Sequence, residues 1–188
     1  MNTKNKLVDN PFWRGFRWIV WGGAAGLLSL PLIAMRFTNE VNWTAFDFLV
    51  MGMMLAAVCL AFELALRMAR NGYYMLGAGL AAGTAFLITW SNLAVGIVGN
   101  ENNPVNLIFF GIVAIAVVGT LVSRLQPSGM ARTMLVAGFA QAATVVLALF
   151  KEAPIVAVIL GVFTAMWLLS SVLFGKAADA LPTIAQAS

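Results

Sequence analysis

The densest group of polar side chains in this chain lies in one short segment, Gly99-Asn100-Glu101-Asn102-Asn103-Pro104-Val105-Asn106. It offers one carboxylate, Glu101, and four amide side chains, among them Asn103 and Asn106. Oxygen-rich loops bind hard cations, although tight calcium sites usually need several carboxylates. Asn103-Pro104 also matches the N-cap and first residue of a helix, whose dipole would favour Glu101 nearby. A capped turn, a cation site and a ligand or partner contact therefore all stay open.

Four further polar side chains interrupt apolar runs: Thr89, Asn92, Gln141 and Thr144. An unpaired amide at the depth of Gln141 would cost several kcal/mol in a bilayer, so that side chain needs a partner. Asn92 is the nearest candidate by spacing, and it should also join the 99–106 segment in one ordered cluster. These side chains either make hydrogen bonds between helices or line a small polar cavity.

Glu63 is the acidic residue placed deepest in an apolar run. Arg67 follows four residues later, the order that favours a salt bridge along a helix. The alternative is a carboxylate that faces the helix bundle and binds a proton or a ligand. Asp47 is instead expected to cap a helix, because Thr44 precedes it by three residues.

Several classes of chemistry are excluded by residues that the chain lacks. It has no histidine, so histidine-ligated haem, histidine zinc sites and Ser-His-Asp triads are excluded. Its single cysteine, Cys59, lies in an apolar run and can form no internal disulfide. We find no catalytic, cofactor or metal-binding motif, and we expect no cofactor.

These residues sit in an unusually apolar chain. Of its 188 residues 62% are hydrophobic and only 10% charged, against about 45–50% and 25% in soluble domains. Six apolar runs of roughly 20 residues fit a bilayer of about 30 Å of hydrocarbon. The sequence therefore predicts an all-α, polytopic transmembrane bundle forming a single domain. The expected helices are 11–35, 45–67, 74–98, 104–123, 132–150 and 154–174.

Basic residues predict how the chain crosses the bilayer. Nine of the 11 Lys and Arg residues lie in the N-terminal segment, the second and fourth connections and the C-terminal tail, and the other two, Arg36 and Lys151, lie on the opposite side. Because cytoplasmic loops are enriched in Lys and Arg, both termini are expected in the cytoplasm. The net charge of +4 is thus read as a topology signal and not as a nucleic-acid surface.

Small residues recur at steps of four and three along the expected spans, which keeps them on one helix face. Such faces let membrane helices approach closely. We expect spans three and five to lie centrally. In span three the positions are Ala78, Ala82, Ala85, Thr89, Asn92, Gly96 and Gly99, and span one contains Gly22-x-x-x-Gly26.

The stretch from Trp90 to Asn106 has the pattern W-x-N-x-A-V-G-I-x-G-x-E-x-N-P-x-N. In this it resembles a widespread group of uncharacterised small bacterial inner-membrane proteins, and the likeness extends over most of the chain. The resemblance implies a multi-pass protein of the bacterial cytoplasmic membrane and supplies no activity.

Two functions are compatible with these patterns. The first is a non-enzymatic helix bundle that acts as an accessory or interaction protein, with the lipid bilayer and either a membrane-protein partner or a second copy as its contacts. The second is a small-solute transporter or channel with a polar seam between spans three and five. An intramembrane enzyme is the least favoured class, because no nucleophile–base or metal constellation is present.

Overall fold

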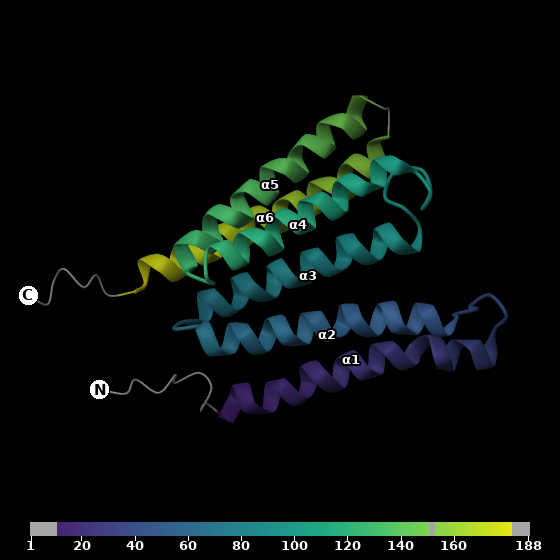
Figure 1. The fold of residues 1–188 in the computed structure, drawn as a ribbon, viewed down its shortest axis with the longest axis horizontal. Helices are drawn as coiled ribbons and strands as arrows, with labels where there is room; N and C mark the ends of the chain where they lie inside the picture. Colours follow the sequence, from purple (N-terminus) through teal and green to yellow (C-terminus); the bar gives the residue numbers. More distant parts are fainter. Residues whose placement is uncertain (1–10, 151–152, 182–188) are drawn as a thin grey trace, which may run out of the picture. The chain divides into compact units, whose positions relative to one another are not determined.

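A computed structural model describes residues 11–150 and 153–181, and this part of the chain is helical without strands. Six helices are each long and apolar enough to cross a membrane, which confirms the predicted fold class (Figure 1). Contacts divide the chain into two compact units, residues 1–69 and 70–188, where the sequence predicted a single domain. The helices are α1 Pro11–Phe37, α2 Ala45–Met68, α3 Gly72–Ala94, α4 Leu107–Val122, α5 Pro127–Phe150 and α6 Pro154–Asp179, with a 3-10 turn, η1, at Pro104–Asn106.

The first unit is the hairpin of α1 and α2. Thr44 and Asp47 form the predicted capping box at the start of α2: the Thr44 N–H donates to Asp47 Oδ2 at 2.7 Å, and the Asp47 N–H donates to Thr44 Oγ1 at 3.4 Å. This reciprocal pair satisfies backbone donors that the first helical turn leaves unpaired. Near the other end of α2, Phe62 meets the rings of Trp13 and Phe16 on α1, with centroids 6.4 and 5.7 Å apart.

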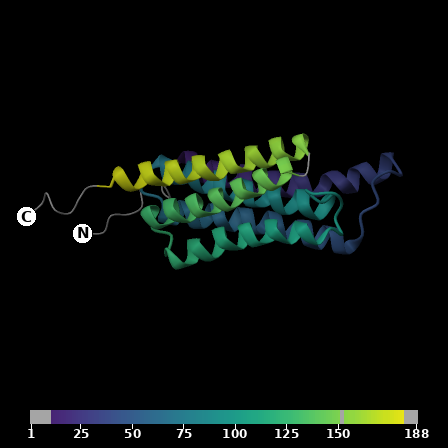
Figure 2. The same cartoon turned by 90° about the horizontal axis from the view of Figure 1, so that it is seen from above.

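The second unit is organised around α6, which packs extensively against both α5 and α3. Two adjacent serines tie the three helices together. Ser170 Oγ donates to the carbonyl of Gly77 on α3 at 2.8 Å, and Ser171 Oγ donates to the carbonyl of Ala131 on α5 at 2.7 Å. Since α3 and α5 each pack against α4 as well, the expectation that spans three and five are central stays a prediction. In both views α3 to α6 run alongside one another, with the ends of α6 and α3 offset (Figures 1 and 2).

Close packing in the second unit depends on glycines that face large side chains. A Cβ at Gly77 would touch the ring of Phe174 at 3.3 Å, and one at Gly138 would lie 2.7 Å from Leu168 Cδ2. Small residues thus let α3 and α5 approach α6, the packing principle expected for membrane helices. Beside Gly77, Tyr74 packs edge-on against Phe174 and donates its hydroxyl to the Leu125 carbonyl at 2.9 Å.

Three predicted helix ends differ from the structure by four or five residues, and the other ends by no more than three. The third helix ends at Ala94 and not at residue 98, because Gly96 adopts a φ of +71° that a right-handed helix cannot contain. The fifth helix begins at Pro127, not at residue 132, since proline suits the first helical turn. The sixth runs five residues beyond the expected end, to Asp179.

Candidate functional site

The polar turn, residues 98–106, is a hydrogen-bonded cluster with Asn106 at its centre. The Asn106 side chain is 3% exposed and accepts from the Val98 N–H at 2.9 Å. Its amide nitrogen donates to the carbonyls of Asn100 at 2.7 Å and Val98 at 3.3 Å. Asn92, at the end of α3, donates to the Asn106 carbonyl at 2.9 Å. The Asn106 side chain therefore holds the turn together, and the Asn92 side chain ties the turn to α3.

Three of the four amide oxygens in this turn, those of Asn100, Asn103 and Asn106, accept hydrogen bonds from backbone N–H groups of the same turn. Asn103 Oδ1 accepts from the Val105 N–H at 3.1 Å and so caps η1, and Asn100 Oδ1 accepts from the Asn102 N–H at 3.1 Å. Glu101 is exposed, and the Asn102 side chain contacts its carboxylate only at the long distance of 3.5 Å. The geometry favours the capped-turn interpretation over a cation site. Among the described residues no cluster of three His, Cys, Asp or Glu side chains could hold a metal ion.

The polar side chains of α5 pair with each other and not with α3. Gln141 is fully buried, and its Nε2 donates to Thr144 Oγ1 at 3.1 Å, while Thr144 Oγ1 donates to the Gln141 carbonyl at 2.6 Å. Asn92 is engaged with Asn106 instead, so the two amides are not partners. Thr89 is half-buried, whereas Thr84, which the sequence reasoning did not single out, is fully buried. The expected polar seam between spans three and five is therefore not formed.

Three buried polar atoms find no hydrogen-bond partner in the described part of the chain: Asn92 Oδ1, Gln141 Oε1 and Trp167 Nε1. Trp167 is fully buried on α6, and a Cβ at Gly138, one turn from Gln141, would lie 3.5 Å from its Cβ. The sequence reasoning missed this tryptophan, because a lone Trp in an apolar run is as typical of a lipid-facing position as of a buried one.

A cavity of about 560 Å³ lies between the polar turn, the first residues of α4 and α6 and the last residues of α5. Its walls are almost entirely apolar, with Thr144 and Asn103 as the two polar side chains. Small-molecule sites are typically cavities of about 300–1,000 Å³ with a few polar groups. This cavity, the apolar cavity, has room for a small apolar molecule and offers no charge to bind an ion.

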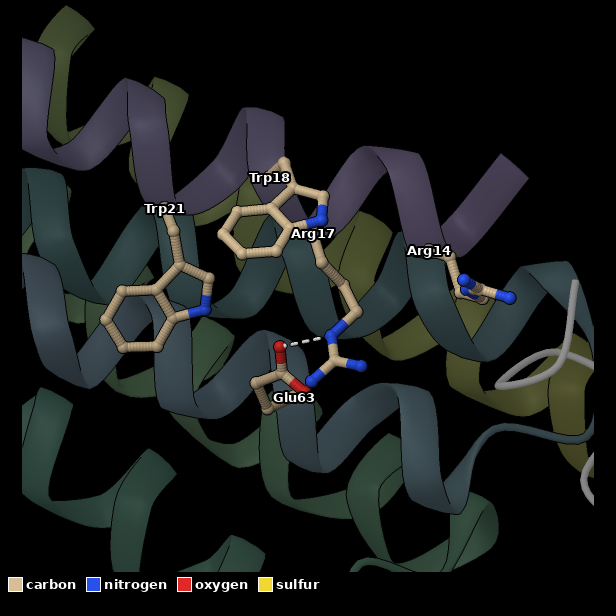
Figure 3. A pocket seen from close by; sticks show the side chains of 5 residues that line it. All are labelled: Arg14, Arg17, Trp18, Trp21 and Glu63. Carbon is tan, nitrogen blue, oxygen red and sulfur yellow. Dashed lines mark hydrogen bonds and ion pairs between the residues drawn. The ribbon is translucent and has the colours of Figure 1, made fainter. Parts of the chain in front are cut away.

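A second cavity, of about 500 Å³, lies within the α1–α2 hairpin and holds charged side chains. We call it the arginine cavity; it is lined by Arg14, Arg17, Trp18, Trp21 and Glu63 (Figure 3). Glu63 Oε1 accepts from Arg17 Nε at 2.7 Å. The sequence predicted Arg67 as the partner of Glu63, but the ion pair in the structure joins the two helices.

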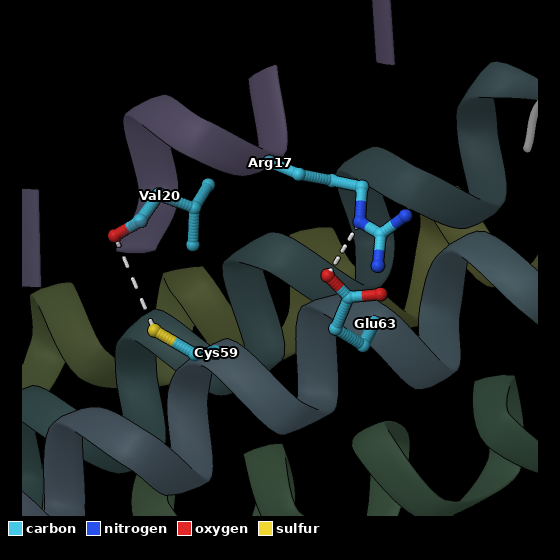
Figure 4. A network of polar contacts seen from close by, with 4 residues as sticks. All are labelled: Arg17, Val20, Cys59 and Glu63. Atoms are coloured by element: carbon cyan, nitrogen blue, oxygen red, sulfur yellow. Dashed lines mark hydrogen bonds and ion pairs between the residues drawn. The ribbon is translucent and has the colours of Figure 1, made fainter. Parts of the chain in front are cut away.

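One turn away, α2 also contacts the α1 backbone. Cys59 is buried, and its Sγ lies 4.0 Å from the Val20 carbonyl oxygen, a weak thiol hydrogen bond (Figure 4). Together with the Arg17–Glu63 pair it fixes the register of α1 against α2. We assign this cysteine a packing role.

Fold and sites together define a multi-pass, all-α membrane protein with an ordered polar turn, an apolar cavity and a charged cavity. Comparisons with protein-family models, curated proteins and solved structures found no match to this chain.

Proposed function

We propose that the protein is a non-enzymatic interaction protein of the bacterial cytoplasmic membrane, which seats α1 against a transmembrane helix of a partner. The observation that carries this proposal is the open glycine face of α1. A Cβ added at Gly15, Gly22 or Gly26 would meet no described atom of the α1–α2 hairpin within 4 Å. No residue of α1 is classed as buried.

The glycine face points away from the helix that α1 already contacts. Trp13, Phe16 and Val20 face α2, as their ring and sulfur contacts show. At 100° per residue, Gly22 and Gly26 lie on roughly the opposite side of α1. The two faces of α1 are therefore separate, and α2 leaves the glycines uncovered.

Glycine in a helix interior costs about 0.8–1.0 kcal/mol relative to alanine. In a membrane this cost is offset where the missing side chain lets another helix approach closely, as in the G-x-x-x-G dimers. Lipid chains need no such approach. The glycine face thus suits a helix from a second copy of this chain or from another membrane protein.

Cross-linking in native membranes tests this proposal. A cysteine at Gly26, in a Cys59→Ser background, should cross-link to a second polypeptide, and Gly22→Leu should reduce that product at least about fivefold. Ala57→Leu is the matched control, because Ala57 is also exposed but lies on α2 and not on the glycine face. A cross-link confined within one chain, or equal effects of both leucines, would contradict the proposal.

The bacterial location is supported by the resemblance of the Trp90–Asn106 stretch, and the orientation by the distribution of Lys and Arg. Both termini are then cytoplasmic. Topology-reporter fusions after Asn39, Asn102 and Glu152 should report the outside, and a fusion after Ser188 the inside. A C-terminal fusion that reports the outside would reverse the orientation.

Transport of a small solute has less geometric support. A transport path between spans three and five would require α3 and α5 to face each other, with Asn92 opposite Gln141. In the structure α6 packs against both helices, and each amide has another hydrogen-bond partner. The interaction function therefore has the stronger support.

A further inference from the structure

The arginine cavity combines charges and aromatic rings in a way that the interaction proposal does not use. Arg14, Arg17, Trp18 and Trp21 follow at steps of three, one and three, so they share one face of α1. Glu63 enters from α2 (Figure 3). From these contacts we propose that the cavity binds a phosphate group, that of an anionic phospholipid headgroup.

Glu63 holds Arg17 without using up its donors. The ion pair engages the Nε of Arg17, one of five N–H donors in the guanidinium fork. The Glu63 side chain is 13% exposed and the Arg17 side chain 43%, so the carboxylate anchors the guanidinium from the less exposed side. Figure 3 shows the Arg17 guanidinium against the Glu63 carboxylate, with Arg14 on the same helix closer to the start of α1.

The charged side chains that line the cavity have a net charge of one positive unit. Glu63 neutralises Arg17, and Arg14 supplies the remaining positive charge. A phosphodiester carries a single negative charge and suits the planar, bidentate donor pattern of arginine. Binding of one such phosphate would leave the cavity neutral. A metal cation would instead add to the positive charge of the cavity.

The tryptophans favour a lipid as the source of this phosphate. Trp18 is 81% exposed and Trp21 41% exposed, and they lie about two and three turns from the start of α1. Tryptophan is enriched at the headgroup level of bilayers, where its ring is apolar and its N–H can donate to a headgroup oxygen. Basic pockets between transmembrane helices are known sites for anionic headgroups.

Lipid binding to the full-length protein tests the proposal. Native mass spectrometry of the purified chain, titrated with phosphatidylglycerol or phosphatidylcholine, should show tighter retention of the anionic lipid. Arg14→Gln should weaken phosphatidylglycerol binding about tenfold, the effect of removing a charge-assisted contact. Arg14→Lys keeps the charge but not the bidentate fork, so its affinity for phosphatidylglycerol should lie between those of the wild type and Arg14→Gln.

Arg36→Gln is the matched control, because Arg36 lies in the last turn of the same helix, far from the cavity. Thermal unfolding of each variant checks that the fold is intact, and Arg14 is chosen because Arg17 also holds the hairpin together. Inorganic phosphate and glycerol 3-phosphate form the second arm of the test.

If the soluble phosphates stabilise the wild type but not Arg14→Gln, while neither lipid is retained, that result would support a phosphate site and contradict a lipid as the source of the phosphate. Equal retention of both lipids with no effect of soluble phosphate would overturn the proposal. Equal weakening by Arg14→Gln and Arg36→Gln would also overturn it, because the effect would then be one of surface charge. None of these outcomes depends on the glycine face of α1.

Discussion

Replacing Gly96 with alanine should destabilise the second unit by about 3 kcal/mol or more. Gly96 has a φ of +71°, a region that costs a residue with a Cβ roughly 1–2 kcal/mol. The added Cβ would also overlap the carbonyl group of Asn100, which is backbone and cannot rotate away. The melting temperature in detergent should fall by roughly 6–12 °C.

Gly79→Ala is the matched control for this substitution. Gly79 lies within α3, and a Cβ there would meet no atom within 4 Å in the described part of the chain. Alanine in a helix interior is favoured over glycine by about 0.5–1 kcal/mol, so this variant should melt at the same temperature or higher. A melting temperature for Gly96→Ala that matches Gly79→Ala would show that the turn relaxes at no cost.

Gly96 also illustrates where sequence reasoning was sufficient and where it was not. The sequence correctly predicted that Gly96 lets a backbone approach, but it placed this glycine within a helical seam. The regular spacing of small residues continues past Ala94, so spacing alone did not reveal the helix end. The positive φ of Gly96 marks the end of the helix, and spacing in the sequence gives no sign of that angle.

Local chemistry was predictable because its partners are close in sequence. Six apolar runs predicted six helices, Thr44 and Asp47 predicted a capping box, and Asn103-Pro104 predicted a helix start. In each case the residues that determine the structure lie within one apolar run or a few positions apart, so they can be identified from the sequence alone.

Pairings between helices were not predictable in the same way. Glu63 was assigned to Arg67, four residues away, but its ion pair is with Arg17, 46 residues away. Small-residue spacing identifies a face that packs but not the helix it packs against. For that reason the contacts of α6 with α3 and α5, among them the hydrogen bonds of Ser170 and Ser171, were not predicted from the sequence.

The polar turn yields the second large effect. Asn106→Leu keeps a side chain of similar size but removes the acceptor of the Val98 N–H and the donor to two carbonyls. Those carbonyls keep other partners, because the Asn103 side chain donates to Val98 and the Asn103 N–H donates to Asn100. The Val98 N–H loses its acceptor, and an unsatisfied backbone donor costs about 1–3 kcal/mol. We expect a loss of about 1–3 kcal/mol in stability.

Hydrogen exchange locates this effect. The Val98 amide should exchange much faster in Asn106→Leu than in the wild type, whereas amides in the middle of α5 should change only with global stability. Glu101→Gln serves as the control, because Glu101 lies in the same turn but is exposed. It should leave both the Val98 amide and the melting temperature close to wild type.

The same pair of variants separates a structural turn from a cation site. If the amide oxygens are committed to the backbone, as their contacts with Val98, Asn102 and Val105 indicate, calcium or magnesium should not raise the melting temperature of the wild type. A cation-dependent rise that Glu101→Gln abolishes would mean that the turn opens to bind an ion. In that case the hydrogen bonds of Asn106 would be present only in the ion-free form. The Val98 amide should then exchange its hydrogen faster when the cation is added.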